Sequence, residues 1–196
     1  MRILLIGATG TIGKAIAAAL TGQHEVLAAS RSHSPYSVDI TKPASLQALF
    51  AQVGKLDAII SAAGDAAFGP LGELTDADFA FCLSNKLMGQ VNVVRLGFAT
   101  VADGGSITIT SGILAQRPMP GSSAVSLVNG GLEGFMRAAA LEAPRKIRVN
   151  AVSPGFATET LLALKMDPAF GTPASDIARL YLRVLEGHMT GETVTS

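Results

Sequence analysis

A glycine-rich turn near the N-terminus has the residue types and spacing of a phosphate-binding loop. It reads Gly7-Ala8-Thr9-Gly10-Thr11-Ile12-Gly13, between the apolar run Ile3 to Ile6 and a helical pattern that begins near Lys14. The first glycine permits a tight turn, the second lets a diphosphate approach the backbone, and the third lets the helix pack against the strand. The free amides and the positive dipole end of the helix then face the anion. The turn therefore predicts a dinucleotide site, and a plain strand-to-helix connection is the alternative.

The residues after the second apolar strand indicate which dinucleotide would bind. A fold that prefers NAD places a carboxylate there for the ribose hydroxyls, but this chain has Ser30-Arg31-Ser32-His33. A guanidinium flanked by hydroxyls suits a 2'-phosphate. We therefore expect NADP as the cofactor, held in part by Ser30 and Arg31, with NAD less favoured. The alternative is that Arg31 is a solvated loop residue.

The elements that would position this turn alternate along the chain. Alternation of apolar strands with helical patterns predicts a parallel sheet with helices on both faces. Strands are expected at residues 2–6, 25–29, 37–40, 56–60, 106–111, 147–152 and 192–195. Helices are expected at residues 11–21, 43–52, 75–99, 122–142 and 174–185, with Thr75 and Asp78 as a capping box. Residues 103–105 are expected to form a turn before the fifth strand.

Two connections stand out. Only about seven residues separate the second and third predicted strands, although a parallel crossover usually takes a dozen or more residues. Either the helix is missing and residues 31–36 cross as an extended loop, or the strand assigned to residues 37–40 is wrong. The irregular stretch 156–172 is long enough to cover a substrate, and its apolar side chains suggest an apolar ligand, unless they only pack the core.

Composition narrows the class of protein. The chain has 196 residues, 48% of them hydrophobic, which is enough for one domain spanning residues 1–196 to bury its own core. Fifteen basic residues balance fifteen acidic ones, so we expect neither nucleic acid nor an anionic membrane as a partner. The single cysteine, Cys82, excludes an internal disulfide and fits a small core residue better than a nucleophile, and no metal site is expected. Since the run Ile3 to Ile6 is too short for a signal peptide or membrane span, we expect a cytoplasmic protein.

Five segments carry a resemblance to a known family. They are the glycine turn, Val38-Asp39-Ile40-Thr41, Ser61-Ala62-Ala63-Gly64, Gly131-Leu132-Glu133-Gly134-Phe135 and Ile147-Arg148-Val149-Asn150-Ala151-Val152-Ser153-Pro154-Gly155. The chain resembles the short-chain dehydrogenase/reductase family over nearly its whole length. The resemblance implies a Rossmann-type doubly wound parallel sheet of about seven strands with helices on both faces. It also implies cofactor contacts from residues near the adenine, the adenosine and the nicotinamide: Asp39, Ile40, Ala62, Ala63, Gly64, Pro154 and Thr158.

The catalytic residues that the resemblance implies are displaced or missing. The family uses an Asn, a Ser and a Tyr-x-x-x-Lys, but the register set by residues 131–135 puts Val125 at the tyrosine position and Asn129 at the lysine position. Counting back thirteen residues from Val125 reaches Gly112, one residue past Ser111. Spacing before Gly89 puts Lys86 at the family's Asn position. The only tyrosines, Tyr36 and Tyr181, belong to other elements.

These departures suggest that Asn and Lys have exchanged places. Lys86, from the opposite helix, would bind the nicotinamide ribose or donate a proton to a carbonyl under reduction, and Ser111 would polarise the same oxygen. Asn129 completes the candidate catalytic set. The alternative is that Lys86 is a surface residue and the site is inactive.

Two functions remain open from the sequence. One is an NADP-dependent oxidoreductase that transfers hydride to a small apolar carbonyl or enone through a non-standard active site. The other is a catalytically silent NADP-binding sensor or scaffold. The resemblance also implies a homodimer or homotetramer acting on a small-molecule substrate of unknown identity.

Overall fold

Seven parallel strands form one sheet in the computed structural model, which describes all 196 residues. The strand order is β3-β2-β1-β4-β5-β6-β7, and every neighbouring pair is parallel. The strands are β1 (Arg2–Ile6), β2 (Glu25–Ser30), β3 (Tyr36–Ser37), β4 (Leu56–Ser61), β5 (Val101–Thr110), β6 (Arg148–Ser153) and β7 (Thr193–Thr195). This order confirms the predicted doubly wound sheet, in which all strands run the same way and the order of successive strands reverses between β1 and β4.

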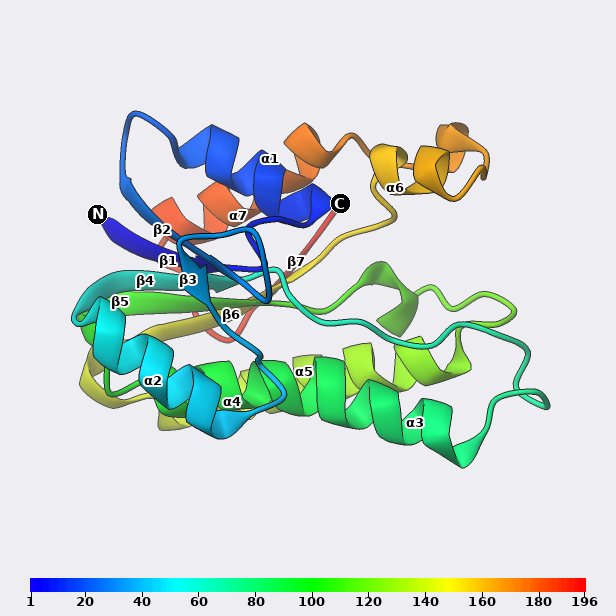
Figure 1. Ribbon diagram of the computed structural model, residues 1–196, viewed down its shortest axis with the longest axis horizontal. Helices are drawn as coiled ribbons and strands as arrows, with labels where there is room; N and C mark the ends of the chain where they lie inside the picture. Colours follow the sequence, from blue (N-terminus) through cyan, green and yellow to red (C-terminus); the bar gives the residue numbers. More distant parts are fainter.

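Helices cover both faces of the sheet. In Figure 1, α1 (Thr11–Leu20) and α7 (Ala174–Glu186) lie on one face, and α2 (Pro43–Val53), α4 (Met88–Gly97) and α5 (Ser123–Glu142) lie on the other. Shorter helices are α3 (Asp76–Cys82), the π-helical turn η1 (Leu83–Leu87), α6 (Thr158–Ala163), and the 3-10 turns η2 (Ile113–Ala115), η3 (Pro144–Lys146) and η4 (Pro168–Phe170). None of the helices has the length and apolar character needed to cross a membrane.

Alternation along the buried strands divides the core into two layers. In β1, Ile3 and Leu5 pack with the helices α1 and α7, whereas Leu4 and Ile6 pack with α2, α4 and α5. Successive strand residues point to opposite faces, so a strand covered on both sides must be apolar throughout. The two layers hold β1 rigidly, and the glycine turn at its end is therefore well positioned.

The connection between β2 and β3 has no helix. β3 contains only two residues, paired as Ala29 with Tyr36 and Ser30 with Ser37, so residues 31–35 cross as a short loop. This confirms the loop alternative. The strand predicted at residues 37–40 is largely wrong. Val38 and Ile40 are buried at alternate positions, which imitates a strand, but they pack on the core after the chain has left the sheet.

The helix predicted at residues 75–99 is three consecutive pieces. Thr75 and Asp78 form the predicted capping box at the start of α3. The chain then widens into η1 before α4 begins at Met88. A π turn adds a residue to the helical repeat, and such turns are frequent at functional sites. This turn carries Lys86, one of the predicted catalytic residues.

β5 begins earlier than predicted. Its register against β4 shifts between Leu56 and Ala58, so Asp103 to Gly105 form a bulge within the strand and not a turn before it. The strand ends at Thr110, which leaves Ser111 just beyond it. In the stretch 156–172, predicted to be irregular, α6 and η4 form short helices. The other predicted boundaries agree with the observed ones to within one residue.

Candidate active site

Two cavities meet at the carboxyl ends of the central strands. The first, of about 260 Å³, lies over the ends of β1, β2 and β4, and the second, of about 240 Å³, lies over the ends of β4, β5 and β6. Ala62, Ala63 and Gly64 line both cavities, so the two form one continuous depression. Ligands of open α/β sheets bind at this edge, where the strand order reverses.

The glycine turn fits a closely approaching diphosphate. A Cβ on Gly7 would lie 2.7 Å from the Ala62 carbonyl, and one on Gly13 would lie 2.0 Å from the Gly7 oxygen. Gly10 has no such obstruction, since the nearest atom would be 3.5 Å away. No side chain caps the first turn of α1. Its leading amides therefore remain available to an anion, as a dinucleotide requires.

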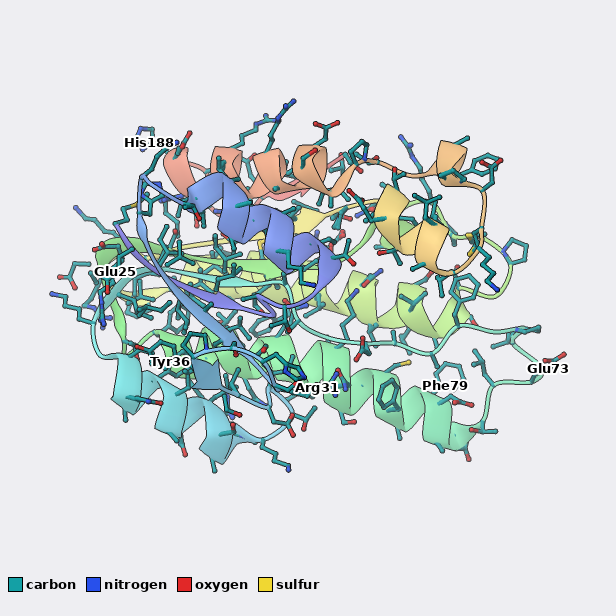
Figure 2. The ribbon with its side chains drawn as sticks, turned by 45° about the horizontal axis from the view of Figure 1, so that its top comes forward. Glu25, Arg31, Tyr36, Glu73, Phe79 and His188 are labelled. Atoms are coloured by element: carbon teal, nitrogen blue, oxygen red, sulfur yellow. The ribbon has the colours of Figure 1, made fainter.

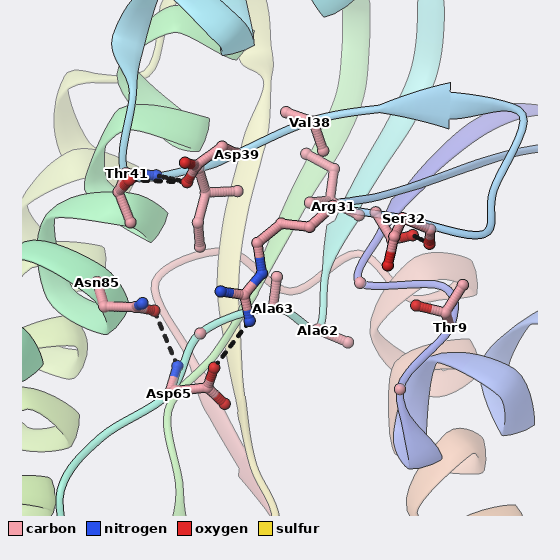
Figure 3. A pocket seen from close by; sticks show the side chains of 16 residues that line it. Thr9, Arg31, Ser32, Val38, Asp39, Thr41, Ala62, Ala63, Asp65 and Asn85 are labelled. Carbon is pink, nitrogen blue, oxygen red and sulfur yellow. Dashed lines mark hydrogen bonds and ion pairs between the residues drawn. The ribbon is translucent and has the colours of Figure 1, made fainter.

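The first cavity collects most of the residues predicted for the adenosine half. The predicted cofactor-binding residues that line it are Gly7, Thr9, Gly10, Ser30, Arg31, Asp39, Ile40, Ala62, Ala63 and Gly64. Figure 3 shows Arg31 extending across this cavity from the β2–β3 loop. The Ser30 hydroxyl donates to the Ser32 carbonyl within the same loop, so it shapes the loop as well as lining the cavity.

Asp39 is held in its ionised form. Its Oδ1 accepts hydrogen bonds from the Thr41 hydroxyl at 2.7 Å and the Thr41 amide at 3.0 Å. The hydrogen bond from the Thr41 hydroxyl is the main reason that the pKa of Asp39 lies below its usual value, and Lys42 lowers this pKa further. A fixed carboxylate beside Ile40 supplies acceptors at one end of the cavity.

The second cavity brings together the three candidate catalytic residues. Lys86, Ser111 and Asn129 all line it, with Pro154 and Val125 among the other walls. Lys86 is the only titratable residue in the lining. An apolar chamber with one amine can therefore bind an electron-rich oxygen or exchange one proton with it.

The Lys86 amine is anchored inside the protein. Nζ donates to the Ser111 carbonyl oxygen at 2.9 Å. Desolvation lowers the pKa of Lys86 from 10.5 to about 8, against the opposing influence of Asp65 and Cys82. Although the residue is only half-buried, it lines the cavity, so its remaining exposure is toward the space that a ligand would fill. It is not a surface residue with its amine in bulk water.

The Ser111 hydroxyl is already engaged. Oγ donates to Glu133 Oε1 at 2.9 Å, and Glu133 also accepts from the Gln116 amide, whose oxygen accepts from Ser153 at 3.2 Å. Glu133 is buried and has no ion pair. The hydroxyl hydrogen of Ser111 therefore points to the Glu133 carboxylate and not into the cavity. The sequence identified residue 133 only as part of a family segment and missed this network.

Asn129 fills the space that a serine at position 112 would need. Its Nδ2 donates to the Gly112 carbonyl at 3.3 Å, and a Cβ on Gly112 would lie 2.7 Å from the same nitrogen. Because that carbonyl can only accept, the other end of the carboxamide must be the oxygen. This Oδ1 is buried without a hydrogen-bond partner. It is an acceptor at the cavity wall that lacks a donor.

Neither tyrosine lines the second cavity. Tyr181 is fully buried in α7, with its hydroxyl 2.7 Å from Thr110 Oγ1, and burial raises its pKa. Tyr36 lies on β3 against the core layer that contains α2, as Figure 2 shows. No tyrosine of this chain therefore stands in for the tyrosine that serves as proton donor in the family.

The end of β5 is fixed by a buried side chain. The Gln90 carboxamide accepts from the Thr110 amide at 2.8 Å and donates to the Thr110 carbonyl at 2.5 Å. The pairing imitates a neighbouring strand where β4 has already ended. Since Ser111 follows directly, Gln90 positions the residue that holds Lys86.

Several residues differ from the predicted set. Thr11, Gly13 and Thr158 line neither cavity, whereas Ile12 lines the second. Asp65 and Asn85 line the first cavity but were missed, although each directly adjoins a predicted residue. Asn85 and Lys86 are consecutive residues of η1 and line different cavities, Asn85 the first and Lys86 the second.

The fold and the glycine turn are those of the dinucleotide-binding class of α/β proteins, and comparison with known proteins gives the family. A family model described as enoyl-(acyl carrier protein) reductase matches residues 7–172. The chain belongs to the short-chain dehydrogenase/reductase family of oxidoreductases, which use a nicotinamide cofactor.

Individual relatives support this assignment. The human 3-oxoacyl-[acyl-carrier-protein] reductase is 34% identical over 131 residues, covering 63% of this chain and 55% of that protein. Carbonyl reductase family member 4 from Xenopus laevis is 28% identical, covering 97% of this chain and 93% of the relative. In several curated relatives, including the human reductase, the match spans only about half of their length.

Solved structures resemble the whole chain. Protein lin1944 from Listeria innocua is 40% identical with a TM-score of 0.94, covering 100% of this chain and 98% of the other. A small-chain dehydrogenase in complex with NADPH is 27% identical with a TM-score of 0.87, covering 99% of this chain and 95% of the other.

Proposed function

We propose that this protein is an NADP-dependent oxidoreductase that reduces a small apolar carbonyl or enone, with Lys86 as the proton donor. The observation that carries the proposal is the Lys86 amine, which is the only titratable group in the second cavity and has a pKa of about 8. A group whose pKa lies near the working pH is suited to both holding and releasing a proton.

The residues of the first cavity fit the cofactor. The uncapped amides of α1 and the open approach at Gly10 would hold the diphosphate, and Arg31 would bind the 2'-phosphate. The bound nicotinamide supplies the hydride when it is reduced. A similar small-chain dehydrogenase in complex with NADPH supports the choice of the phosphorylated cofactor.

The residues of the second cavity take different roles. Lys86 Nζ would place a proton on the substrate oxygen, and its bond to the Ser111 carbonyl fixes its direction. Ser111 is less suited to donation because its hydrogen is used by Glu133. The Asn129 oxygen, which lacks a donor, would accept a hydrogen bond from a ribose or substrate hydroxyl. Apolar walls would exclude water from the reacting atoms.

Binding and turnover need separate measurements. We would titrate the purified protein with NADPH and NADH by nicotinamide fluorescence, and then follow nicotinamide absorbance with aldehydes, ketones, enones, and 3-oxoacyl and enoyl thioesters. The thioesters are included because the family model and one relative bear acyl-carrier-protein reductase names. NADPH should bind more tightly than NADH, and Lys86→Met should abolish turnover while NADPH still binds.

Each negative result has its own meaning. Failure of both nucleotides to bind would overturn the dinucleotide proposal as a whole. Tight NADPH binding with no oxidation across the panel would favour the alternative, a cofactor-binding sensor or scaffold without turnover. Turnover that survives in Lys86→Met would remove Lys86 from the proton transfer.

Self-association is a further part of the proposal. Exposed apolar side chains gather on the helices α3 to α5 and the π turn between them: Phe81, Leu83, Met88, Leu127 and Leu141. Surfaces of this kind mark protein interaction sites. We expect a homodimer or homotetramer, and sedimentation equilibrium giving the monomer mass at micromolar concentration would contradict this.

A further inference from the structure

An ion pair crosses the first cavity. Arg31 Nη2 lies 3.0 Å from Asp65 Oδ2, and both residues line the cavity. Arg31 comes from the β2–β3 loop and Asp65 from the chain after β4, so the pair joins two separate sides of the site. Figure 3 shows the guanidinium reaching over the cavity to the carboxylate.

The two partners differ in how firmly they are held. The Asp65 amide donates to Asn85 Oδ1 at 3.0 Å, and Asn85 is buried in η1. Arg31 makes no side-chain hydrogen bond other than the one to Asp65. The backbone at Asp65 is therefore tethered to η1, whereas the Arg31 guanidinium has no second partner to hold it in place.

The pair is weak enough to open. The side chains of Arg31 and Asp65 are 69% and 62% exposed, and exposed pairs of this kind contribute little to stability. A phosphate group offers a guanidinium two parallel charge-assisted hydrogen bonds, whereas a ribose hydroxyl offers no charge. A 2'-phosphate can thus take Arg31 from Asp65, and a 2'-hydroxyl cannot.

We infer that Asp65 is a specificity-determining residue that competes with the 2'-phosphate of the cofactor for Arg31. The inference rests on the proposed dinucleotide function. In the free protein, Asp65 holds Arg31 across the cavity, and part of the attraction between Arg31 and the phosphate is spent on separating the pair. A nucleotide without the 2'-phosphate leaves the pair intact. Asp65 therefore limits the preference for NADP over NAD.

The test uses nucleotides that occupy only the adenosine half. Affinities of 2',5'-ADP and 5'-AMP are measured by titration calorimetry for the full chain and for Asp65→Asn. We expect 2',5'-ADP to bind about two- to fivefold more tightly to Asp65→Asn, which is the size of effect that an exposed pair supports, with 5'-AMP affinity unchanged. These short nucleotides also avoid the influence of Asp65 on Lys86 in the neighbouring cavity.

Two further variants make the result specific. Asp176→Asn removes a comparable exposed pair, with Arg179 at 3.2 Å on α7, and should leave both affinities unchanged. Arg31→Met should weaken 2',5'-ADP, and adding Asp65→Asn to it should produce no gain. A gain that persists without Arg31 would show that Asp65 acts on the phosphate directly and would overturn the competition.

The remaining outcomes separate this inference from the proposed function. Equal 2',5'-ADP affinity in the original chain and Asp65→Asn would overturn the role of Asp65 while leaving dinucleotide binding in place. An equal gain for 5'-AMP would show a general obstruction and would also overturn it. If neither nucleotide binds the original chain and NADPH does not bind either, the proposed function itself fails.

Discussion

The buried amine of Lys86 should make the stability of the protein depend on pH in a distinctive way. Burial lowers the pKa of Lys86 from 10.5 to about 8, so the unfolded chain holds its proton more tightly than the folded protein does. Below pH 8 both states are protonated, and folding must desolvate the charge. Above about pH 10.5 both states are neutral and this cost is gone.

The size of the effect follows from the same two values. The difference between 10.5 and about 8 corresponds to about 3 kcal/mol, which is an upper figure because Lys86 keeps some exposure to the cavity. Lys86→Met removes the charge and the bond to the Ser111 carbonyl. Relative to the original chain, the variant should be most stable below pH 8, and this advantage should fall by up to about 3 kcal/mol as pH rises to 10.5.

Urea unfolding of both proteins at several pH values between 7 and 10.5 measures this quantity. Other titrating groups, including Tyr181, affect both proteins alike and cancel in the difference. Lys14→Met is the matched control, since Lys14 is exposed on α1, and its difference from the original chain should not change with pH. A difference between Lys86→Met and the original chain that stays constant from pH 7 to 10.5 would refute a desolvated amine.

Three other substitutions test the framework of the site. Gly13→Ala should lower the free energy of unfolding by about 3 kcal/mol or more and abolish NADPH binding, because the new Cβ would lie 2.0 Å from a backbone oxygen. Gly130→Ala in α5 meets open space and should raise the free energy of unfolding by about 1 kcal/mol. Similar unfolding midpoints for the two variants would contradict this. Gln90→Leu should cost about 3 kcal/mol by leaving the buried amide and carbonyl of Thr110 without side-chain partners, and a loss below 1 kcal/mol in denaturant unfolding would argue against the clamp. Tyr181→Phe should cost about 1 kcal/mol and leave turnover unchanged, so a large fall in kcat would return this tyrosine to the mechanism.

The general fold was predictable because its signals are local and repeated. Strands covered on both faces are apolar along their length, and β1 shows this directly before the glycine turn. The edge strand β3 was harder, since two paired residues leave almost no pattern in the sequence. Val38 and Ile40 alternate in burial for a reason unrelated to strand pairing, and this led to the wrong range.

The candidate site was predictable residue by residue only where a backbone motif fixed the position. The sequence predicted one continuous helix over residues 75–99 and did not reveal the π turn that carries Asn85 and Lys86, two neighbours that line different cavities. Glu133 and Asp65 were not identified, because their contacts join segments 22 and 34 residues apart in the chain. Such pairings depend on tertiary packing, which no local pattern encodes.

The departures from the family pattern support one another physically. Asn129 occupies the volume next to Gly112 and donates to its carbonyl, so a serine side chain at 112 and this carboxamide exclude each other. Val125 adds apolar surface in place of a phenol. The cation that the family places on the helix of residue 129 is here supplied by Lys86 in η1, where burying the charge costs up to about 3 kcal/mol of folding free energy. A desolvated amine at the wall of a cavity marks a candidate functional site, because burial and neighbouring groups tune such pKa values where proton transfer takes place. Together with its hydrogen bond to the Ser111 carbonyl, this is the physical basis for expecting the Lys86 amine to act on a ligand.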